Sequence, residues 1–264
     1  MSSLFDAAMT EHIVYANPFT RLELPVIEPQ PVQFYEHDEA EALYESAGRI
    51  APRWRTFIEL GTWSGLRFEE QAGLHGHRVD WLRSRLAVVE VMTRRGLRQY
   101  PKSRKSHRVV PVRAGTLGGM SALMTGRPRE ALVFTAPGGG PVDDGNFRDR
   151  VWYPAVDAAR LCGKLAPAED DDYRAGECGP EFCDDARHKI RRFPPRIMRH
   201  TAASWLVQDG VPLYDVQALL GHESFATTQR YAHLAPGAHG RVLESWARRD
   251  DASPTHDVKE ARPS

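Results

Sequence analysis

The sequence lacks any run of about 18 apolar residues, the length that predicts a membrane-spanning helix. Its first residues also lack a basic region followed by an apolar one, which is the pattern of a secretory signal. The chain nevertheless has 264 residues, of which 41% are hydrophobic, so it can bury a substantial core. We therefore expect a globular, cytoplasmic protein.

Cysteine is scarce, and the three residues Cys162, Cys178 and Cys183 are an odd number that does not suit a framework of disulfides. A cytosolic chain keeps such thiols reduced. Together with His188 they could supply the four ligands of a structural zinc ion, but their spacing in the sequence is looser than that of a usual zinc knuckle. Free thiols are the preferred interpretation, and we expect no metal and no other cofactor.

The formal net charge is zero, which by itself argues against a polyanionic partner. The charges are strongly segregated, however. Residues 78–113 contain eleven Lys or Arg and two acidic residues, whereas residues 169–185 contain eight acidic residues and one arginine. A local basic block can bind nucleic acid whatever the total charge, and a solvated charged surface is the alternative.

The proline content and periodicity of the chain change along its length and predict three parts. Residues 1–33 contain several prolines and little periodicity, which is typical of an extended arm or linker. Residues 34–249 contain the periodic segments, interrupted by a charged insertion over 162–193. Residues 250–264 are expected to be a disordered tail.

Within the central part, apolar periodicity predicts helices and one hairpin. The helices are expected from about Phe34, over 52–60, 116–125, 147–161, 211–220 and 241–249, and in a short segment that carries Tyr231. Residues 85–92 have strand character, and 97–101 and 106–112 are expected to pair as a hairpin with 102–105 at its tip. A lysine there is usually exposed, although such a tip can also reach into a groove and donate a proton.

The stretch from Arg196 to His233 has the side chains to hold a phosphate and attack it. Arg199 is followed by an amphipathic segment that Gly221 should end, and His222 comes directly after this stop. On one continuous helix His222 and Tyr231 would lie on opposite faces, since each residue turns about 100°. The break at Gly221 allows both to face one site.

Arg67 lies in the segment Ser64-Gly-Leu-Arg67-Phe-Glu-Glu70, where Gly65 permits a tight turn before a new helix. Backbone N–H groups at a helix start attract anions, so Arg67 could join a phosphate site. The alternative is that it only pairs with Glu70, one turn further on.

These motifs together resemble those of the tyrosine recombinases, the phage integrase family. The segment around Arg67 resembles the first arginine box of that family, and 101–111 resembles its lysine hairpin. Arg199-His200-Thr and Leu-Gly-His222 up to Tyr231 resemble its C-terminal boxes. The resemblance spans about residues 34–249 and implies an α+β fold, mostly helical with a small antiparallel sheet on one side.

The resemblance also implies a chemistry. A tyrosine hydroxyl of the family attacks a DNA phosphodiester and forms a 3′-phosphotyrosine link, without a nucleotide cofactor. Tyr231 would be this nucleophile, and Arg67 and Arg199 would bind the non-bridging oxygens, where charge builds up in the transition state. His222 would bind the phosphate and Glu70 would orient Arg67.

Lys102 would be the general acid for the leaving 5′-oxygen, with Lys105 as the second choice. The family usually has histidine or lysine three residues before Arg199, but here the residue is Arg196, which cannot act as a base near neutral pH. His200 would be mainly structural. The residues expected to contact the DNA backbone are Arg94, Arg95, Arg98, Arg104, Lys105 and Arg108.

The partners implied are double-stranded DNA, further copies of the chain in a tetrameric synapse docked through 241–249, and an accessory DNA-bending protein. A bacterial or phage-encoded protein of the nucleoid would fit. Family members usually carry a further helical DNA-binding domain, in place of which the sequence has some thirty Pro-containing residues. A DNA-binding remnant with little or no recombination activity is therefore the alternative, and a metal-dependent nuclease has little support.

Overall fold

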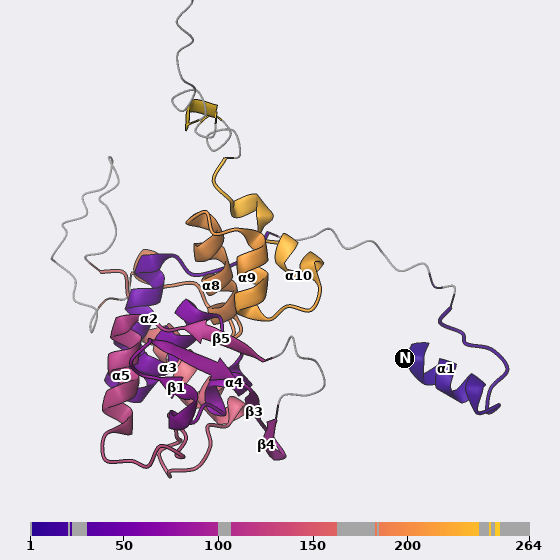
Figure 1. Ribbon diagram of the computed structural model, residues 1–264, viewed down its shortest axis with the longest axis horizontal. Helices are drawn as coiled ribbons and strands as arrows, with labels where there is room; N and C mark the ends of the chain where they lie inside the picture. Colours follow the sequence, from indigo (N-terminus) through magenta and orange to yellow (C-terminus); the bar gives the residue numbers. More distant parts are fainter. Residues whose placement is uncertain are drawn as a thin grey trace, which may run out of the picture. The chain divides into compact units, whose positions relative to one another are not determined.

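The computed structural model describes residues 2–20, 22, 31–99, 107–162, 183, 185–237, 243 and 246–248. They fall into two units, Met1–Pro31 and Val32–Ser264, and each is described by itself. In the smaller unit helix α1 (Ser2–Thr10) is followed by turns (Figure 1), and the Asn17 amide donates a hydrogen bond to the Asp6 carboxylate at 2.6 Å. The proline-rich composition does not predict this helix.

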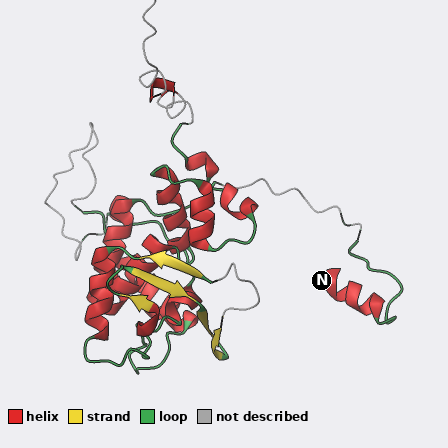
Figure 2. Ribbon diagram, viewed as in Figure 1, coloured by secondary structure: helices red, strands yellow, loops and turns green. Residues whose placement is uncertain are grey.

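Helices dominate the larger unit, as Figure 2 shows. They are α2 (His37–Ile50), α3 (Pro52–Ser64), α4 (Phe68–Ala72), α5 (Ala114–Met124), α6 (Asp144–Phe147), α7 (Tyr153–Ala158), α8 (Ile197–Gln208), α9 (Leu213–Leu220) and α10 (Phe225–Gln229). Single helical turns are η1 (Gly76–Arg78), η4 (Ala186–His188) and η5 (Ala232–Leu234), and the π-helical turn η3 (Arg148–Trp152) joins α6 to α7. The helices that the sequence predicts from about Phe34, from Pro52 and over 116–125, 147–161 and 211–220 are confirmed.

Helix α3 lies at the centre of the core, in contact with α2, α5 and α8. It begins with Pro52. Proline has no backbone N–H, but at the first position of a helix this group would have no acceptor within the helix, so no hydrogen bond is lost. Its Phe57 is fully buried, with ring centroids 5.1 Å from Phe134 and 5.0 Å from Phe147. Burying one such side chain stabilises the fold by about 1.5–3 kcal/mol, so this aromatic cluster anchors α3.

The strands are short and antiparallel. In one sheet β2 (Arg85–Val88) lies between β1 (Val79–Asp80) and β5 (Arg108–Pro111), and a second sheet holds β3 (Glu90–Thr93) and β4 (Gly96–Gln99). Leu86 pairs with Val110 in the first sheet, and Thr93 pairs with Gly96 in the second. Strand β3 packs beside α4, and β5 beside α9 (Figure 1). The expected α+β class, mostly helical with a small antiparallel sheet, is confirmed.

The expected pairing of 97–101 with 106–112 is wrong for the described residues. Strand β4 folds back on β3 through a tight turn that ends at Gly96, where φ is 105° and glycine is favoured. Strand β5 then pairs with β2, and Val110 faces the core. Residues 100–106 lie outside the described part of the chain.

The last helices carry most of the C-terminal motif. Helix α9 ends at Gly221 with φ 66°, which confirms the expected stop. Helix α10 follows Ser224 and ends before Tyr231, so the tyrosine lies between α10 and η5 and not on the helix that the sequence predicts. A small core cluster joins α8 and α9 to Tyr231, through Ala203, Val207, Val216 and Leu220.

Within the described residues, no helix is both long and apolar enough to cross a membrane. Most of the insertion 162–193, most of the helix expected over 241–249 and all of the tail 250–264 lie outside the described residues.

Candidate active site

Arg199 lies in the first turn of α8 and binds the C-terminal ends of two other helices. Its Nη1 donates to the Gly65 carbonyl after α3, and its Nη2 donates to the Leu220 carbonyl of α9, both at 2.7 Å. The last carbonyls of a helix have no partner within it and carry the negative end of its dipole, so the guanidinium stabilises both ends. Because a guanidinium has five N–H donors, Arg199 retains donors for a further ligand.

Two glycines allow these helix ends to approach closely. Gly65 and Gly221 have φ of 65° and 66°, in the left-handed region that glycine favours. A Cβ at Gly65 would lie 2.3 Å from Leu220 Cδ2, and one at Gly221 would lie 3.1 Å from Arg108 Nη1. The Gly-Leu-Arg and Leu-Gly-His motifs therefore serve packing as well as turns.

Arg67 directly precedes α4, with its backbone N–H bonded to Glu70 Oε2 at 2.8 Å and its Nη1 bonded to Glu70 Oε1 at 3.1 Å. The Arg67 side chain is nevertheless 38% exposed, whereas that of Glu70 is fully buried. The ion pair between Arg67 and Glu70, which the sequence left open as an alternative, is therefore present. It orients the Arg67 guanidinium and leaves part of it exposed to solvent.

A second arginine, Arg108, holds Glu70 from β5. Its Nη2 and Nη1 donate to the two carboxylate oxygens at 2.7 and 3.0 Å, and its Nε donates to the Leu219 carbonyl at 2.7 Å. Burial alone would raise the pKa of Glu70, but the hydrogen bonds and charge of Arg108 lower it below its usual value. Glu70 is therefore ionised at neutral pH.

Arg108 was expected to contact DNA, but its side chain does not lie on the surface. Its side chain is 7% exposed, because side chains alternate along a strand and Arg108 shares the inward face of β5 with buried Val110. Its guanidinium therefore binds Glu70 and the end of α9 in the interior and is not on the surface.

His222 follows Gly221 and is held by α10. Its Nδ1 lies 2.9 Å from the hydroxyl of Thr228, which is fully buried. Burial, followed by the charges of Arg199, Arg67 and Arg108, lowers the pKa of His222 to about 4. The ring is therefore neutral at pH 7.

Tyr231 is 2% exposed, and its hydroxyl lies 2.7 Å from His200 Nδ1. Burial raises the pKa of Tyr231, although Arg230 and Arg199 oppose this effect. Burial and the charges of Arg230, Arg196 and Arg199 lower the pKa of His200 to about 4. At neutral pH the phenol is thus protonated and the imidazole neutral, so the Tyr231 O–H donates to His200 Nδ1.

The electrostatic balance of this cluster is positive. Burial, then the charge of Arg67, lowers the pKa of Arg199 to about 10, so it remains a cation at pH 7. Among the described residues, Arg67, Arg108 and Arg199 share one carboxylate, that of Glu70. Such an excess of fixed donors and positive charge suits an anion.

The comparisons with known proteins agree with these motifs. The sequence model of the phage integrase family matches residues 183–237. The tyrosine recombinase XerD of Ralstonia nicotianae is 29% identical over 242 residues, which cover 88% of this chain and 65% of the relative. The integrase of Salmonella phage P22 is 51% identical over 62 residues, covering 22% of this chain and 16% of that integrase.

A solved structure of the Tn1549 transposon integrase, in complex with circular intermediate DNA, superposes with a TM-score of 0.66. It is 16% identical, and the match covers 94% of this chain and 76% of that chain, so this likeness concerns the fold. The family model, the relatives and the fold therefore all support the tyrosine recombinase, or phage integrase, family. The chain spans slightly less than two thirds, 65%, of the length of the Ralstonia recombinase.

The family match contains Arg199, His200, His222 and Tyr231, whereas Arg67 lies outside its bounds. The fold brings Arg67 to Arg199, which follows it by more than a hundred residues. Arg196, the residue that departs from the family pattern, is exposed at the start of α8. Lys102, Arg104 and Lys105 lie outside the described residues.

The other basic residues expected to face DNA are Arg94, Arg95 and Arg98 on the β3–β4 hairpin. All three are exposed, and within the described residues none forms an ion pair. In the same basic block, Arg83 and Arg85 bind Asp80. The hairpin is therefore one part of the described block whose positive charge no ion pair balances, and exposed Arg113 is another.

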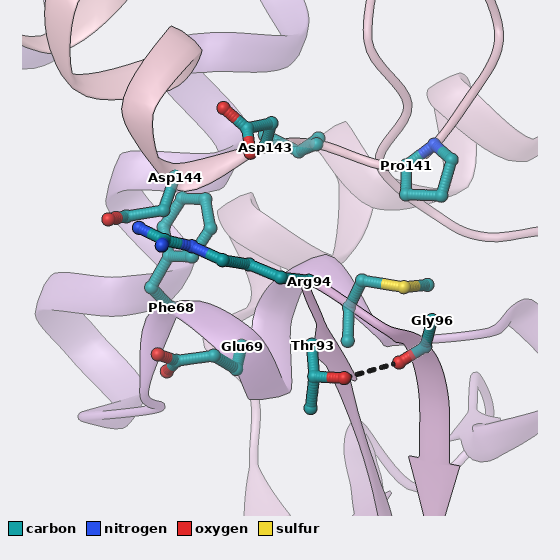
Figure 3. A pocket seen from close by; sticks show the side chains of 10 residues that line it. Phe68, Glu69, Thr93, Arg94, Gly96, Pro141, Asp143 and Asp144 are labelled. Atoms are coloured by element: carbon teal, nitrogen blue, oxygen red, sulfur yellow. Dashed lines mark hydrogen bonds between the residues drawn. The ribbon is translucent and has the colours of Figure 1, made fainter.

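A pocket of about 500 Å³ lies between this hairpin and the start of α6 (Figure 3). Arg94 points across the ring of Phe68 towards Asp144, and Glu69 and Asp143 also line the pocket. Three carboxylates beside one arginine do not suit a phosphate. None of the predicted catalytic residues lines this pocket.

Three potential metal ligands meet elsewhere. The ligand atoms of Cys162, Cys183 and His188 lie within 4.8 Å of one another, although free thiols are the preferred interpretation from the sequence. Cys178 lies outside the described residues.

Sequence reasoning misses three contacts of the site: Arg108 with Glu70, Thr228 with His222, and His200 with Tyr231. Thr228 follows His222 by six residues, on the helix after its loop, and the bond joins two side chains, so no local backbone pattern signals it. The other two pairs are 38 and 31 residues apart in the chain, and no local pattern links them.

Proposed function

We propose that this chain cleaves and rejoins DNA at a specific site through a covalent 3′-phosphotyrosine intermediate at Tyr231. One observation supports this most: among the described residues, three arginines gather around the Glu70 carboxylate beside His222 and Tyr231. A phosphodiester would bring negative charge to these positively charged donors. The similarity to the tyrosine recombinases supports the same chemistry.

In the proposed step the Tyr231 hydroxyl oxygen attacks the phosphorus, and a new O–P bond forms as the bond to the 5′-oxygen breaks. The phenol proton leaves, and the 5′-oxygen takes up a proton. Arg67 and Arg199 bind the non-bridging oxygens, on which charge increases in the transition state. Replacement of either by alanine should reduce the cleavage rate by roughly two or more powers of ten.

His222 donates a hydrogen bond to the same phosphate in this proposal. Since its ring is neutral, only one nitrogen carries a proton. If the Thr228 hydroxyl donates to Nδ1, the proton lies on Nε2, which then points a donor at the phosphate. Thr228 is therefore a positioning residue that selects the tautomer.

His200 holds the nucleophile in its protonated, buried state. The phenol pKa is raised and the imidazole pKa is about 4, so the proton does not pass to His200 before DNA binds. An anionic phosphate beside the two residues would raise the His200 pKa and favour this transfer. We assign His200 the positioning of Tyr231.

Two further groups complete the proposed reaction. Lys102 is the proposed general acid for the 5′-oxygen, with Lys105 as the second choice. Arg196 is exposed beside the site and acts only through its charge, because it cannot accept a proton near neutral pH.

The proposed domain extends over residues 34–249, with 1–33 as an arm. Its partner is double-stranded DNA, bound through Arg94, Arg95 and Arg98 on the β3–β4 hairpin and through residues 104 and 105. We place it in the cytoplasm, in a tetrameric synapse that docks through residues 241–249 and uses an accessory DNA-bending protein. These assembly features follow from the family resemblance.

The alternative is a DNA-binding remnant with little recombination activity. Two observations favour it: the nucleophile is only 2% exposed, and Arg196 stands where the family has a histidine or lysine. In this case the protein would bind DNA but form no covalent link.

A pool of nicked duplexes of randomised sequence separates the possibilities. At low salt and without added Mg²⁺, we expect a covalent protein–DNA adduct that survives denaturation, is absent in Tyr231→Phe and persists in Tyr214→Phe. Tyr214 is a matched control because it is a second tyrosine of the same C-terminal region and is 70% exposed. Binding without an adduct would favour the remnant, and cleavage that requires Mg²⁺ would favour a nuclease.

A further inference from the structure

Three side chains with sulfur and nitrogen ligand atoms converge at the base of the insertion 162–193. His188 Nδ1 lies 3.1 Å from Cys183 Sγ and 3.5 Å from Cys162 Sγ. Cys183 is 6% exposed and His188 is 2% exposed, whereas Cys162 is half-buried. The cluster is therefore withdrawn from solvent but reachable from one side.

These distances match one face of a zinc coordination tetrahedron. With Zn–S of about 2.3 Å and Zn–N of about 2.0–2.1 Å, a tetrahedral site separates sulfur and nitrogen ligands by about 3.5 Å. The Cys162 sulfur lies at this distance from the nitrogen, 3.5 Å, and the Cys183 sulfur is closer, at 3.1 Å. All three ligand atoms lie within 4.8 Å of one another.

Hydrogen bonding explains this arrangement less well. An imidazole Nδ1 has either one lone pair or one proton, in the plane of the ring. It can form a good hydrogen bond with one thiol, yet two sulfurs approach the same nitrogen. A metal ion between the three atoms would satisfy all of them at once.

The backbone holds the ligands in place from both sides of the insertion. The Leu161 N–H donates to the His188 carbonyl at 2.8 Å, and Arg160 forms a β-bridge with Lys189. The Arg160 side chain also donates from Nε to the Cys183 carbonyl at 2.8 Å. The segment after α7 and the segment before α8 are therefore already joined where the ligands lie.

We propose that Cys162, Cys183 and His188 bind a structural zinc ion that closes the base of the insertion. Soft thiolate and imidazole ligands select zinc over magnesium or calcium. Two thiolates neutralise the ion, so the buried cluster carries no net charge, and binding releases the thiol protons. The three described ligands carry the proposal, and a structural site takes a fourth.

The ion would also stabilise the segment of the chain that leads to the active site. Residues 189–196 lead from His188 to α8, which carries Arg199 and His200. In this segment Phe193 accepts a hydrogen bond from Trp152 Nε1 at 2.7 Å, which ties it to the core. The zinc would fix the other end of the same segment.

Metal analysis of the full chain, purified with a reductant and without added chelator, tests this directly. We expect one zinc per chain in the wild type. The control variant His77→Asn, which replaces an exposed histidine outside the cluster, should also bind one zinc. His188→Asn and Cys183→Ser should lose the ion, whereas Cys162→His, which keeps a zinc ligand, should retain it. A metal-free wild type would overturn the proposal.

A second measurement needs no variant. Removing the ion from wild-type protein with a strong chelator should lower its unfolding temperature and expose additional thiols to a thiol reagent. Adding zinc, but not magnesium, should reverse both effects. An intact mass lower by the two hydrogens of a disulfide, or a chelator without effect on unfolding, would contradict the proposal. Neither experiment depends on recombination activity.

Discussion

Glu70 is a fully buried carboxylate whose charge is balanced within the fold. Arg108 binds both of its oxygens and is itself 7% exposed, so loss of the carboxylate charge would leave a buried guanidinium without its counterion. Breaking a buried ion pair from one side costs about 3–5 kcal/mol. We predict that Glu70→Gln lowers the free energy of unfolding by this amount, measured by denaturant titration at pH 7.

The control for this variant is Asp149→Asn, which breaks the exposed pair with Arg148 and should leave stability unchanged. The pH dependence gives a second check. Because the pKa of Glu70 is lowered in the fold, its contribution is present above the ordinary carboxyl pKa and is lost as the pH falls through the lowered value. Equal stability of wild type and Glu70→Gln at pH 7 would contradict the buried pair.

His200 and His222 predict a loss of stability in mild acid. Both have a pKa of about 4 in the fold, against an ordinary value of 6.5. As the pH falls below 6.5 the unfolded chain takes up protons that the folded chain does not, so stability declines until about pH 4. His200→Asn, which keeps an acceptor for Tyr231, should make this decline shallower.

Denaturant unfolding at several pH values between 4 and 7 measures this effect. The matched control is His77→Asn, which removes an exposed histidine of the same unit. If His200→Asn has the same slope as the wild type, His200 is not the neutral, buried partner of Tyr231 described above.

The helix ends at Gly65 and Gly221 control where Arg199 lies. Gly65→Ala would place a Cβ 2.3 Å from Leu220 Cδ2 and push α9 away from α3. Gly126→Ala is the matched control, because Gly126 has a similar φ of 72° but nothing within 4 Å of its Cβ position. Both variants carry the same backbone strain, and only the first meets a steric clash.

We predict that Gly65→Ala is less stable than Gly126→Ala by about 1–3 kcal/mol, the usual cost of overpacking. It should also slow adduct formation, since the Gly65 and Leu220 carbonyls hold Arg199. Thermal or denaturant unfolding of the two variants gives the comparison. Equal stability would mean that α3 and α9 do not approach as closely as described.

The β3–β4 hairpin carries a prediction on DNA affinity. Arg95 and Arg98 are exposed and form no ion pair among the described residues, so each can neutralise a phosphate, whereas Arg94 points towards Asp144. Replacing Arg95 or Arg98 by glutamine should weaken binding to duplexes of any sequence and reduce the slope of log K against log salt by about 1. Arg148→Gln, which removes an arginine already paired with Asp149, should leave the slope unchanged.

Much of the element order could be predicted from the sequence. Pro52 and Gly221 mark a helix start and a helix end by local chemistry, and both lie where expected. The pairing of β4 could not be predicted, because it depends on which of two neighbouring strands lies closer in the fold. The burial of Arg108 could not be predicted either, because only its tertiary partner Glu70 distinguishes it from the exposed arginines of its block.

For the whole molecule, the candidate site depends on segments far apart in the chain. Arg67, Arg108 and Arg199 come from a helix start, a strand and a second helix, and the folded core brings them to one carboxylate. Motif order and spacing predicted that Arg67, Arg199, His222 and Tyr231 belong together. They could not predict that Tyr231 is buried against His200.

The identity of the residue that becomes joined to DNA decides most directly whether Tyr231 is the nucleophile. The covalent adduct from the nicked duplexes can be digested with nuclease and trypsin and analysed by mass spectrometry. We predict a residual nucleotide on the peptide of residues 231–241, which contains Tyr231 as its only tyrosine. A nucleotide on any other peptide, or an adduct that still forms in Tyr231→Phe, would contradict the assignment of the nucleophile.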